Sequence, residues 1–160
     1  MAEIVNKVAQ SALKTINLED YYPQGERKVI DIKSWLYEGV ILREKEFRTS
    51  LKDKDWSSFQ DTYVALHCSS AAIIPGWAYL LIASHLNGIA KQVVFGDLET
   101  LNALLYQQSL EGLDVSEYED KPIIIKGCSN KPVPQNAYLM LLNKLQPIAR
   151  SIMYGEACSA

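Results

Sequence analysis

The hydrophobic positions of the chain fall into short apolar runs separated by longer amphipathic stretches. The short runs are rich in β-branched residues and too short for helices, so they are predicted to form strands. They cover residues 28–32, 62–67 and 122–126, and two further predicted strands close at Phe95 and Tyr154. The run at 122–126 is uninterrupted, which is typical of a strand buried in a parallel sheet.

Helices are predicted where apolar residues recur every three or four positions. The predicted helices cover residues 3–16, 43–52 and 98–113, together with two stretches that begin near Pro75 and Pro134. Proline is tolerated in the first turn of a helix, where the N–H group that it lacks would have no helical partner. The segment 43–52 is expected to be a surface helix, because its apolar residues form one stripe among charged ones.

The sequence contains an internal duplication, with residues 62–97 as the first repeat and residues 122–156 as the second. From the shared proline onward the two copies align without a gap, and Ala, Tyr, Leu, Ile and Gly recur in register. Self-similarity of this kind is the signature of a repeated structural unit. Cys68 and Cys128 are interpreted as equivalent positions of this unit, and only the segment between cysteine and proline differs, by one residue.

Each repeat is interpreted as a strand, a helix and a second strand. Because strands that alternate with helices form mostly parallel sheets with right-handed crossovers, the predicted fold is of the α/β class. The expected architecture is one three-layer domain over residues 1–160, with a mostly parallel sheet built from two duplicated βαβ units. The helical and strand segment of residues 1–61 is expected to pack on this domain.

Parallel strands end at a common edge of their sheet, and α/β proteins bind ligands in the crevice outside that edge. The residues that the predicted strands place at this edge are His67, Cys68, Ser69, Asp97, Cys128, Ser129, Glu156 and Cys158. Thiolates favour zinc and iron, and a carboxylate can complete a four-ligand site. The three cysteines and Glu156 are therefore the predicted ligands of a zinc or iron ion, with His67, Asp97 and the two serines in support.

Two other interpretations of the cysteines stay open. A cysteine between a strand and a helix N-terminus can have a lowered pKa, so Cys68 or Cys128 could be the nucleophile of a thiol-dependent enzyme or the sulfur-binding residue of a carrier. Free cysteine is also among the most buried residue types, and the thiols could simply fill space in a non-catalytic interaction module. The sequence assigns no catalytic residue.

Composition narrows the class of protein. The net charge is −3 and no long Lys/Arg run occurs, so nucleic acid is not an expected partner. No apolar run approaches the roughly 20 residues of a bilayer span, and the first residues lack a signal-peptide pattern, so a cytoplasmic protein without membrane association is expected. The odd number of cysteines does not indicate a disulfide framework. A nucleotide-driven enzyme is not expected, because a Gly-rich phosphate loop is lacking.

Several motifs resemble an uncharacterised bacterial family, domain of unknown function 2480. They are Leu66-His67-Cys68-Ser69, Phe95-Gly96-Asp97-Leu98-Glu99, Lys126-Gly127-Cys128-Ser129, Pro132-Val133-Pro134 and Gly155-Glu156-Ala157-Cys158-Ser159. The resemblance covers nearly the whole chain and implies no activity. Members of that family are often encoded near iron–sulfur assembly components, which implies iron–sulfur assembly proteins as partners. The hypothesis from sequence is a metal-binding accessory protein linked to that process.

Overall fold

The structure is a computed structural model that describes residues 12–127 and 130–155. The chain forms two compact units. Unit 1 comprises residues 1–23 and 102–160, and unit 2 comprises residues 24–101. Unit 2 is therefore inserted into the sequence of unit 1.

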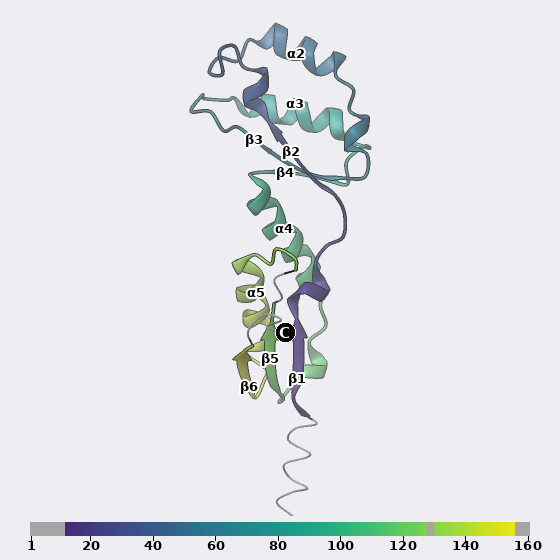
Figure 1. Cartoon of the computed structure of the whole chain (residues 1–160), viewed down its shortest axis with the longest axis vertical. Coiled ribbons are helices and arrows are strands. Elements are labelled where there is room, and N and C mark those ends of the chain that lie inside the picture. The colour runs from purple at the N-terminus through teal and green to yellow at the C-terminus, as the bar shows by residue number, and fades with distance from the viewer. Residues whose placement is uncertain (1–11, 128–129, 156–160) are drawn as a thin grey trace, which may run out of the picture. The chain divides into compact units, whose positions relative to one another are not determined.

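Unit 2 contains a three-stranded parallel sheet and two helices (Figure 1). Its elements are β2 (Arg27–Asp31), α2 (Glu44–Asp53), β3 (Tyr63–His67), α3 (Gly76–Leu86) and β4 (Gln92–Phe95). The strand order is β2-β3-β4, so each new strand is added on the same side of the sheet. With right-handed crossovers, this order places both connecting helices on one face.

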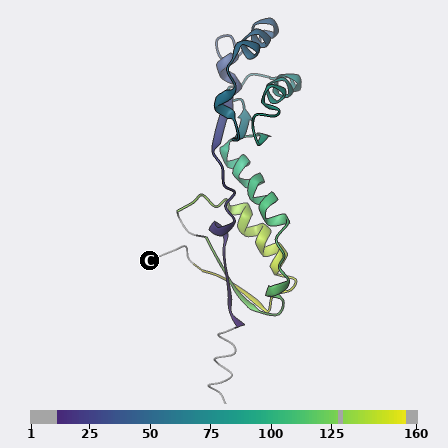
Figure 2. The same ribbon diagram turned by 90° about the vertical axis from the view of Figure 1, so that its right-hand side faces the viewer.

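Unit 1 has the same arrangement. Its elements are β1 (Lys14–Asn17), α4 (Leu98–Glu111, which starts at the end of unit 2), β5 (Pro122–Lys126), α5 (Gln135–Leu145) and β6 (Ser151–Tyr154). The strands are parallel in the order β1-β5-β6, and α4 and α5 run side by side in Figure 2. The first strand of unit 1 therefore comes from a distant part of the chain, because unit 2 lies between β1 and α4 in the sequence.

The hydrophobic cores of the two units match position by position. Every buried residue in the core of unit 1 has a buried counterpart in the core of unit 2. Matching pairs include Ile16 and Ile30, Leu18 and Ile32, Tyr106 and Phe47, Leu110 and Leu51, Ile123 and Val64, and Leu141 and Ile82. In each unit these residues come from the first and central strands, from the short 3-10 helix after the first strand, which contains Leu18 or Ile32, and from both α-helices. Each sheet therefore buries one face under two helices, which makes each unit a two-layer structure.

The turns that lead into the central strands also repeat. Ser57 and Ser116 each donate a backbone N–H to the aspartate two residues earlier, at 2.9 Å in both units. Asp61 and Asp120, just before β3 and β5, both have positive φ, at 59° and 55°. Aspartate is one of the few non-glycine residues that tolerate this conformation, so the duplication includes turn chemistry as well as core residues.

The predicted α/β class and its duplicated parallel units are confirmed. The strands do not join in one three-layer sheet, because each unit closes its own core and the strand order never reverses to place a helix on the second face. The predicted helix at 3–16 is wrong at its end, since Lys14–Asn17 forms β1, and residues 1–11 lie outside the described residues. The expectation that residues 1–160 form one domain stays a prediction. Within the described ranges, no helix combines the length and apolar character that a membrane crossing requires.

Because Leu51 and Leu110 occupy equivalent and almost fully buried positions, 0% and 1% exposed, Leu51→Ala and Leu110→Ala should have similar effects. Each is expected to lower the free energy of unfolding by about 2–5 kcal/mol, since each leaves a cavity in its core. Urea titration followed by circular dichroism measures this. Leu80→Ala, at a position that is 72% exposed, is the control and should change stability by less than about 0.5 kcal/mol.

Candidate functional site

The three strands of unit 2 end beside a group of polar side chains, which we call the unit 2 edge. It consists of Asp31, His67, Cys68, Ser69 and Asp97, at or just after the carboxyl ends of β2, β3 and β4. Asp31 and His67 are register partners on adjacent strands. The three strands are parallel, so their carboxyl ends bring these side chains to one edge of the sheet.

Asp31 connects the end of β2 to the loop that follows β3. Its Oδ1 accepts the backbone N–H groups of Ser69 and Lys33, both at 3.0 Å, and its Oδ2 accepts the Ser69 hydroxyl at 2.5 Å. Burial raises the pKa of the Asp31 carboxyl, but the hydrogen bonds from Ser69 and Lys33 and the charge of His67 outweigh it and hold the pKa below 3.8. Asp31 is therefore ionised at neutral pH and holds the loop that carries Cys68.

Asp97 begins the connection from β4 to α4. Its Oδ1 accepts the backbone N–H of Thr100 at 2.9 Å and the Thr100 hydroxyl at 2.8 Å. The same two hydrogen bonds, with a smaller contribution from the charge of His67, lower the pKa of Asp97. His67 thus interacts electrostatically with two carboxylates, Asp31 and Asp97, and the three groups form a polar cluster at the unit 2 edge.

Cys68 is half-buried and lies close to a phenol. Its Sγ is 3.8 Å from the carbonyl oxygen of Ser70, and it is a free thiol. Burial raises the pKa of Tyr79, on α3, and electrostatic interactions with Cys68 and Asp31 raise it further. Tyr79 packs edge-on against Phe95 with ring centroids 4.9 Å apart. The unit 2 edge therefore offers a thiol, a protonated phenol, an imidazole and two carboxylates.

The structure corrects the equivalence of Cys68 and Cys128. β5 begins 59 residues after β3, and α5 begins 59 residues after α3, so the connecting segments have equal length. Cys68 is consequently equivalent to Gly127, and Cys128 is equivalent to Ser69. A Cβ at Gly127 would collide with the hydroxyl of Tyr138, which explains why unit 1 has glycine at this position.

The expected common edge for all three cysteines is also wrong. Cys68 follows the central strand of one sheet, whereas Cys128 and Cys158 follow β5 and β6 of the other sheet. Cys128, Ser129, Glu156 and Cys158 themselves lie outside the described residues. Among residues 12–127 and 130–155, no group of three or more His, Cys, Asp or Glu side chains is arranged to hold a metal ion.

Two residues of the unit 2 edge were missed from the sequence, Asp31 and Tyr79. Asp31 could have been found only by predicting that β2 pairs with β3, because its partner Ser69 is far away in sequence. Tyr79 recurs in the second repeat as Tyr138, and tyrosines at helical spacing are more often packing residues than parts of a site. Tyr138 indeed contacts Tyr154 in unit 1, with ring centroids 5.5 Å apart, as Tyr79 contacts Phe95 in unit 2.

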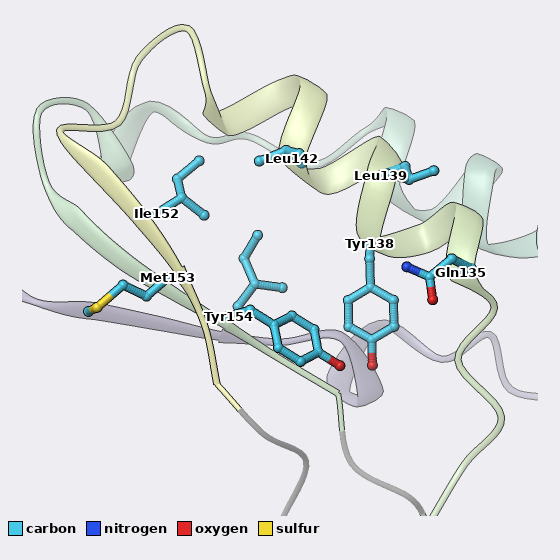
Figure 3. Close-up of a pocket in the computed structure, with 8 residues that line it drawn as sticks. Gln135, Tyr138, Leu139, Leu142, Ile152, Met153 and Tyr154 are labelled. Carbon is cyan, nitrogen blue, oxygen red and sulfur yellow. The ribbon is translucent and has the colours of Figure 1, made fainter.

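Unit 1 has an apolar groove between α5 and the edge strand β6, with a volume of about 300 Å³. It is lined by Ile125, Gln135, Tyr138, Leu139, Leu142, Ile152, Met153 and Tyr154. Figure 3 shows the rings of Tyr138 and Tyr154 close together at one end of the groove. Burial raises the pKa of Tyr138, and its hydrogen bond with Tyr154 adds to this effect.

The fold and the strand-end residues define an α/β protein with two parallel sheets and a polar cluster at the carboxyl edge of one of them. The comparisons with known proteins give its family. Residues 2–160 match the family described as "Protein of unknown function (DUF2480)", and the chain belongs to that family. No curated protein and no solved structure matches the chain.

Asp31→Asn should destabilise the protein at neutral pH by about 1 kcal/mol, because the hydrogen bonds from Ser69 and Lys33 lose their charged acceptor. The folded-state pKa of Asp31 is depressed, so its stabilising contribution is complete above the unfolded value of 3.8 and is lost as the pH falls through the folded value. Chemical denaturation of wild type and variant from pH 7 downward measures the difference, which should shrink under acid conditions. Ser69→Ala in a double-mutant cycle isolates the Asp31–Ser69 interaction, and purely additive effects would contradict it.

Gly127→Ala should lower the free energy of unfolding by about 1–3 kcal/mol, because the new methyl group collides with the Tyr138 hydroxyl. Adding Tyr138→Phe should recover part of this loss, since it removes the closest atom. Urea denaturation measures the free energy of unfolding of the single variant, the double variant and the control. Gly112→Ala is the matched control, because nothing lies within 4 Å of a Cβ at Gly112 and its stability should not fall.

Proposed function

We propose that this protein is a metal-binding accessory protein that holds a zinc or iron ion beside the sheet of unit 1. The proposed ligands are Cys128, Cys158 and Glu156. Iron–sulfur assembly proteins are the proposed partners, on the strength of the family resemblance alone. Thiolates and a carboxylate are suitable donors for either metal.

The observation that carries the proposal is the pairing of β5 with β6. These strands are parallel neighbours, and Ile125 and Tyr154 are register partners near their carboxyl ends. Neighbouring strands are about 4.8 Å apart, a separation that two metal-bound thiolates can bridge. In the sequence, Cys128 follows Ile125 by three residues and Cys158 follows Tyr154 by four, so each cysteine comes shortly after one of these two neighbouring strands.

Cys68 was expected to be the third thiolate of the set. It follows β3 in unit 2, so the strand pairing that supports Cys128 and Cys158 does not extend to it. His67, Asp97 and Ser69 belong to the same unit as Cys68, whereas Ser129 directly follows Cys128. The metal is therefore assigned to the two cysteines of unit 1. The Cys68→Ser variant tests whether Cys68 contributes a ligand to the same site.

Metal content decides the proposal. The full chain, purified without an affinity tag and under reducing conditions, should contain about one zinc or iron ion per chain when measured by plasma mass spectrometry. Cys128→Ser and Cys158→Ser should each lose most of the metal, Glu156→Gln should bind it more weakly, and Cys68→Ser should retain it. A chelator should lower the melting temperature of wild type and of Cys68→Ser, but not of Cys128→Ser.

A chain that neither retains nor takes up zinc or iron would refute the proposal. Equal metal loss in all three cysteine variants would instead establish the three-thiolate site expected from the sequence. Metal loss in Cys68→Ser alone would exclude the assignment to unit 1. Circular dichroism confirms that each variant is folded before its metal content is compared.

Thiol chemistry at Cys68 is the second candidate function, favoured by the nearby Tyr79, whose phenol interacts electrostatically with Cys68. In a sulfur carrier, the Cys68 thiolate would attack the outer sulfur of a donor persulfide. The S–S bond of the donor would break, the donor would leave as a thiolate, and Cys68 would become a persulfide without net oxidation. Tyr79 would donate a hydrogen bond to the transferred sulfur.

Mass spectrometry of the chain after incubation with a small persulfide should show one added sulfur atom on the Cys68 peptide. Tyr79→Phe should slow this transfer, and Cys68→Ser should abolish it. Labelling that is equal at Cys68, Cys128 and Cys158, or that is unchanged in Tyr79→Phe, would remove this candidate.

A further inference from the structure

The groove between α5 and β6 of unit 1 is open to solvent and mainly apolar. Its volume of about 300 Å³ is at the lower end of the range of small-molecule sites, which is about 300–1,000 Å³. Three of the residues that line it, Leu139, Met153 and Tyr154, are large and are 49%, 51% and 66% exposed. The groove therefore has the size and the apolar walls that one small molecule requires.

No residue that lines the groove is charged. Its walls consist of aliphatic side chains, a methionine, two tyrosines and a glutamine. An ionised ligand would lose its hydration on entering the groove and would find no opposite charge among these residues. Burial, the hydrogen bond with Tyr154 and a smaller electrostatic interaction with Glu19 all raise the pKa of Tyr138, so the surroundings of this phenol disfavour negative charge. The groove is thus suited to an uncharged ligand.

One end of the groove is polar. The rings of Tyr138 and Tyr154 lie there with their hydroxyl groups close together (Figure 3). Because the hydrogen bond between them raises the pKa of Tyr138, Tyr138 is the donor, and the O–H of Tyr154 is not used in this bond. Gln135 begins α5 and lies one turn before Tyr138 on the same side of the helix, so its amide adds N–H donors. This end can therefore donate hydrogen bonds to an acceptor oxygen.

The polar end is not a requirement of the fold. Each groove residue has a counterpart 59 residues earlier in unit 2, and there Tyr154 corresponds to Phe95 and Gln135 to Gly76. Unit 2 thus has the same strands and helices without the second phenol or the amide. The two polar groups are therefore specific to the groove of unit 1.

We propose that the groove between α5 and β6 binds an uncharged, mainly apolar small molecule that carries a carbonyl oxygen. The apolar body of the ligand lies between Leu142 and Ile152, and its carbonyl oxygen accepts a hydrogen bond from the hydroxyl of Tyr154. The amide of Gln135 supplies a second donor. The proposed metal ligands are not among the residues that line the groove, so this inference stands or falls separately from the proposed metal site.

Three probes of similar size test the ligand class: acetophenone, ethylbenzene and benzoate. Each is titrated into the full chain with isotope-labelled methionine methyl groups and followed by nuclear magnetic resonance. Met153 lines the groove, whereas Met140 lines a different depression beside Leu110 and is the internal control. Acetophenone should shift the Met153 signal to saturation and leave Met140 unchanged. Ethylbenzene, which lacks the acceptor, should bind about two- to ten-fold more weakly, and benzoate should also bind more weakly because of its charge.

Two pairs of variants test the residues. Tyr154→Phe, which introduces the residue of unit 2, should lower the affinity for acetophenone to that for ethylbenzene and leave the affinity for ethylbenzene unchanged. Leu139→Glu should weaken the binding of both probes, because it places a charge on the apolar wall. Leu80→Glu, at the equivalent exposed position of unit 2, should leave both affinities unchanged. Unchanged melting temperatures confirm that the variants are folded.

The proposal is overturned by a Met153 signal that does not respond to acetophenone. Equal affinities for acetophenone and ethylbenzene, or an acetophenone affinity that survives Tyr154→Phe, would overturn the assigned hydrogen bond. Tighter binding of benzoate would establish an anion site in place of the proposed one. Sensitivity to Leu80→Glu would place the probes in unit 2 and exclude the groove.

Discussion

Each parallel sheet buries one face under two helices, and this requirement fixes how its strands are connected and where they end. A parallel strand cannot return through a tight turn, so each connection must cross over the sheet, and here each crossover contains a helix. The helices bury a narrow apolar stripe, represented by Leu51 on α2 and Leu110 on α4. Since all strands of a unit run in one direction, their carboxyl ends meet, and the polar residues after them are brought together.

The insertion of unit 2 into unit 1 explains how both units keep the same core. β1 stands at the start of the chain, yet its Ile16 takes the place in the core of unit 1 that Ile30 takes in unit 2. Asn17 and Asp31, which end the first strands, both accept a backbone N–H from two residues further on, at 3.0 Å. The two units therefore have the same core positions and the same hydrogen bond after the first strand, although only unit 2 is continuous in sequence.

The units differ where their strands end. Three strand-end positions illustrate this. Unit 2 has His67, Cys68 and Phe95, and the equivalent residues of unit 1 are Lys126, Gly127 and Tyr154. The core positions retain apolar residues, because a change there leaves a cavity or a collision. Several of the strand-end side chains, among them Phe95 and Tyr154, are exposed, so these positions tolerate more change than the core does. This is why one scaffold presents a thiol and an imidazole in unit 2 and an apolar groove with two phenols in unit 1.

Most local elements and their repetition can be predicted from the amino-acid sequence. The predicted strand at 122–126 agrees with β5, and the predicted helix at 98–113 agrees closely with α4, because apolar periodicity is a local property. The tertiary structure alone decided the pairing: residues 14–17 fit a helical pattern, yet they form a strand beside β5. It also decided that the cysteines follow two different sheets and that Asp31 holds the loop of Cys68. Strand pairing depends on contacts between residues far apart in the chain, which local patterns do not specify.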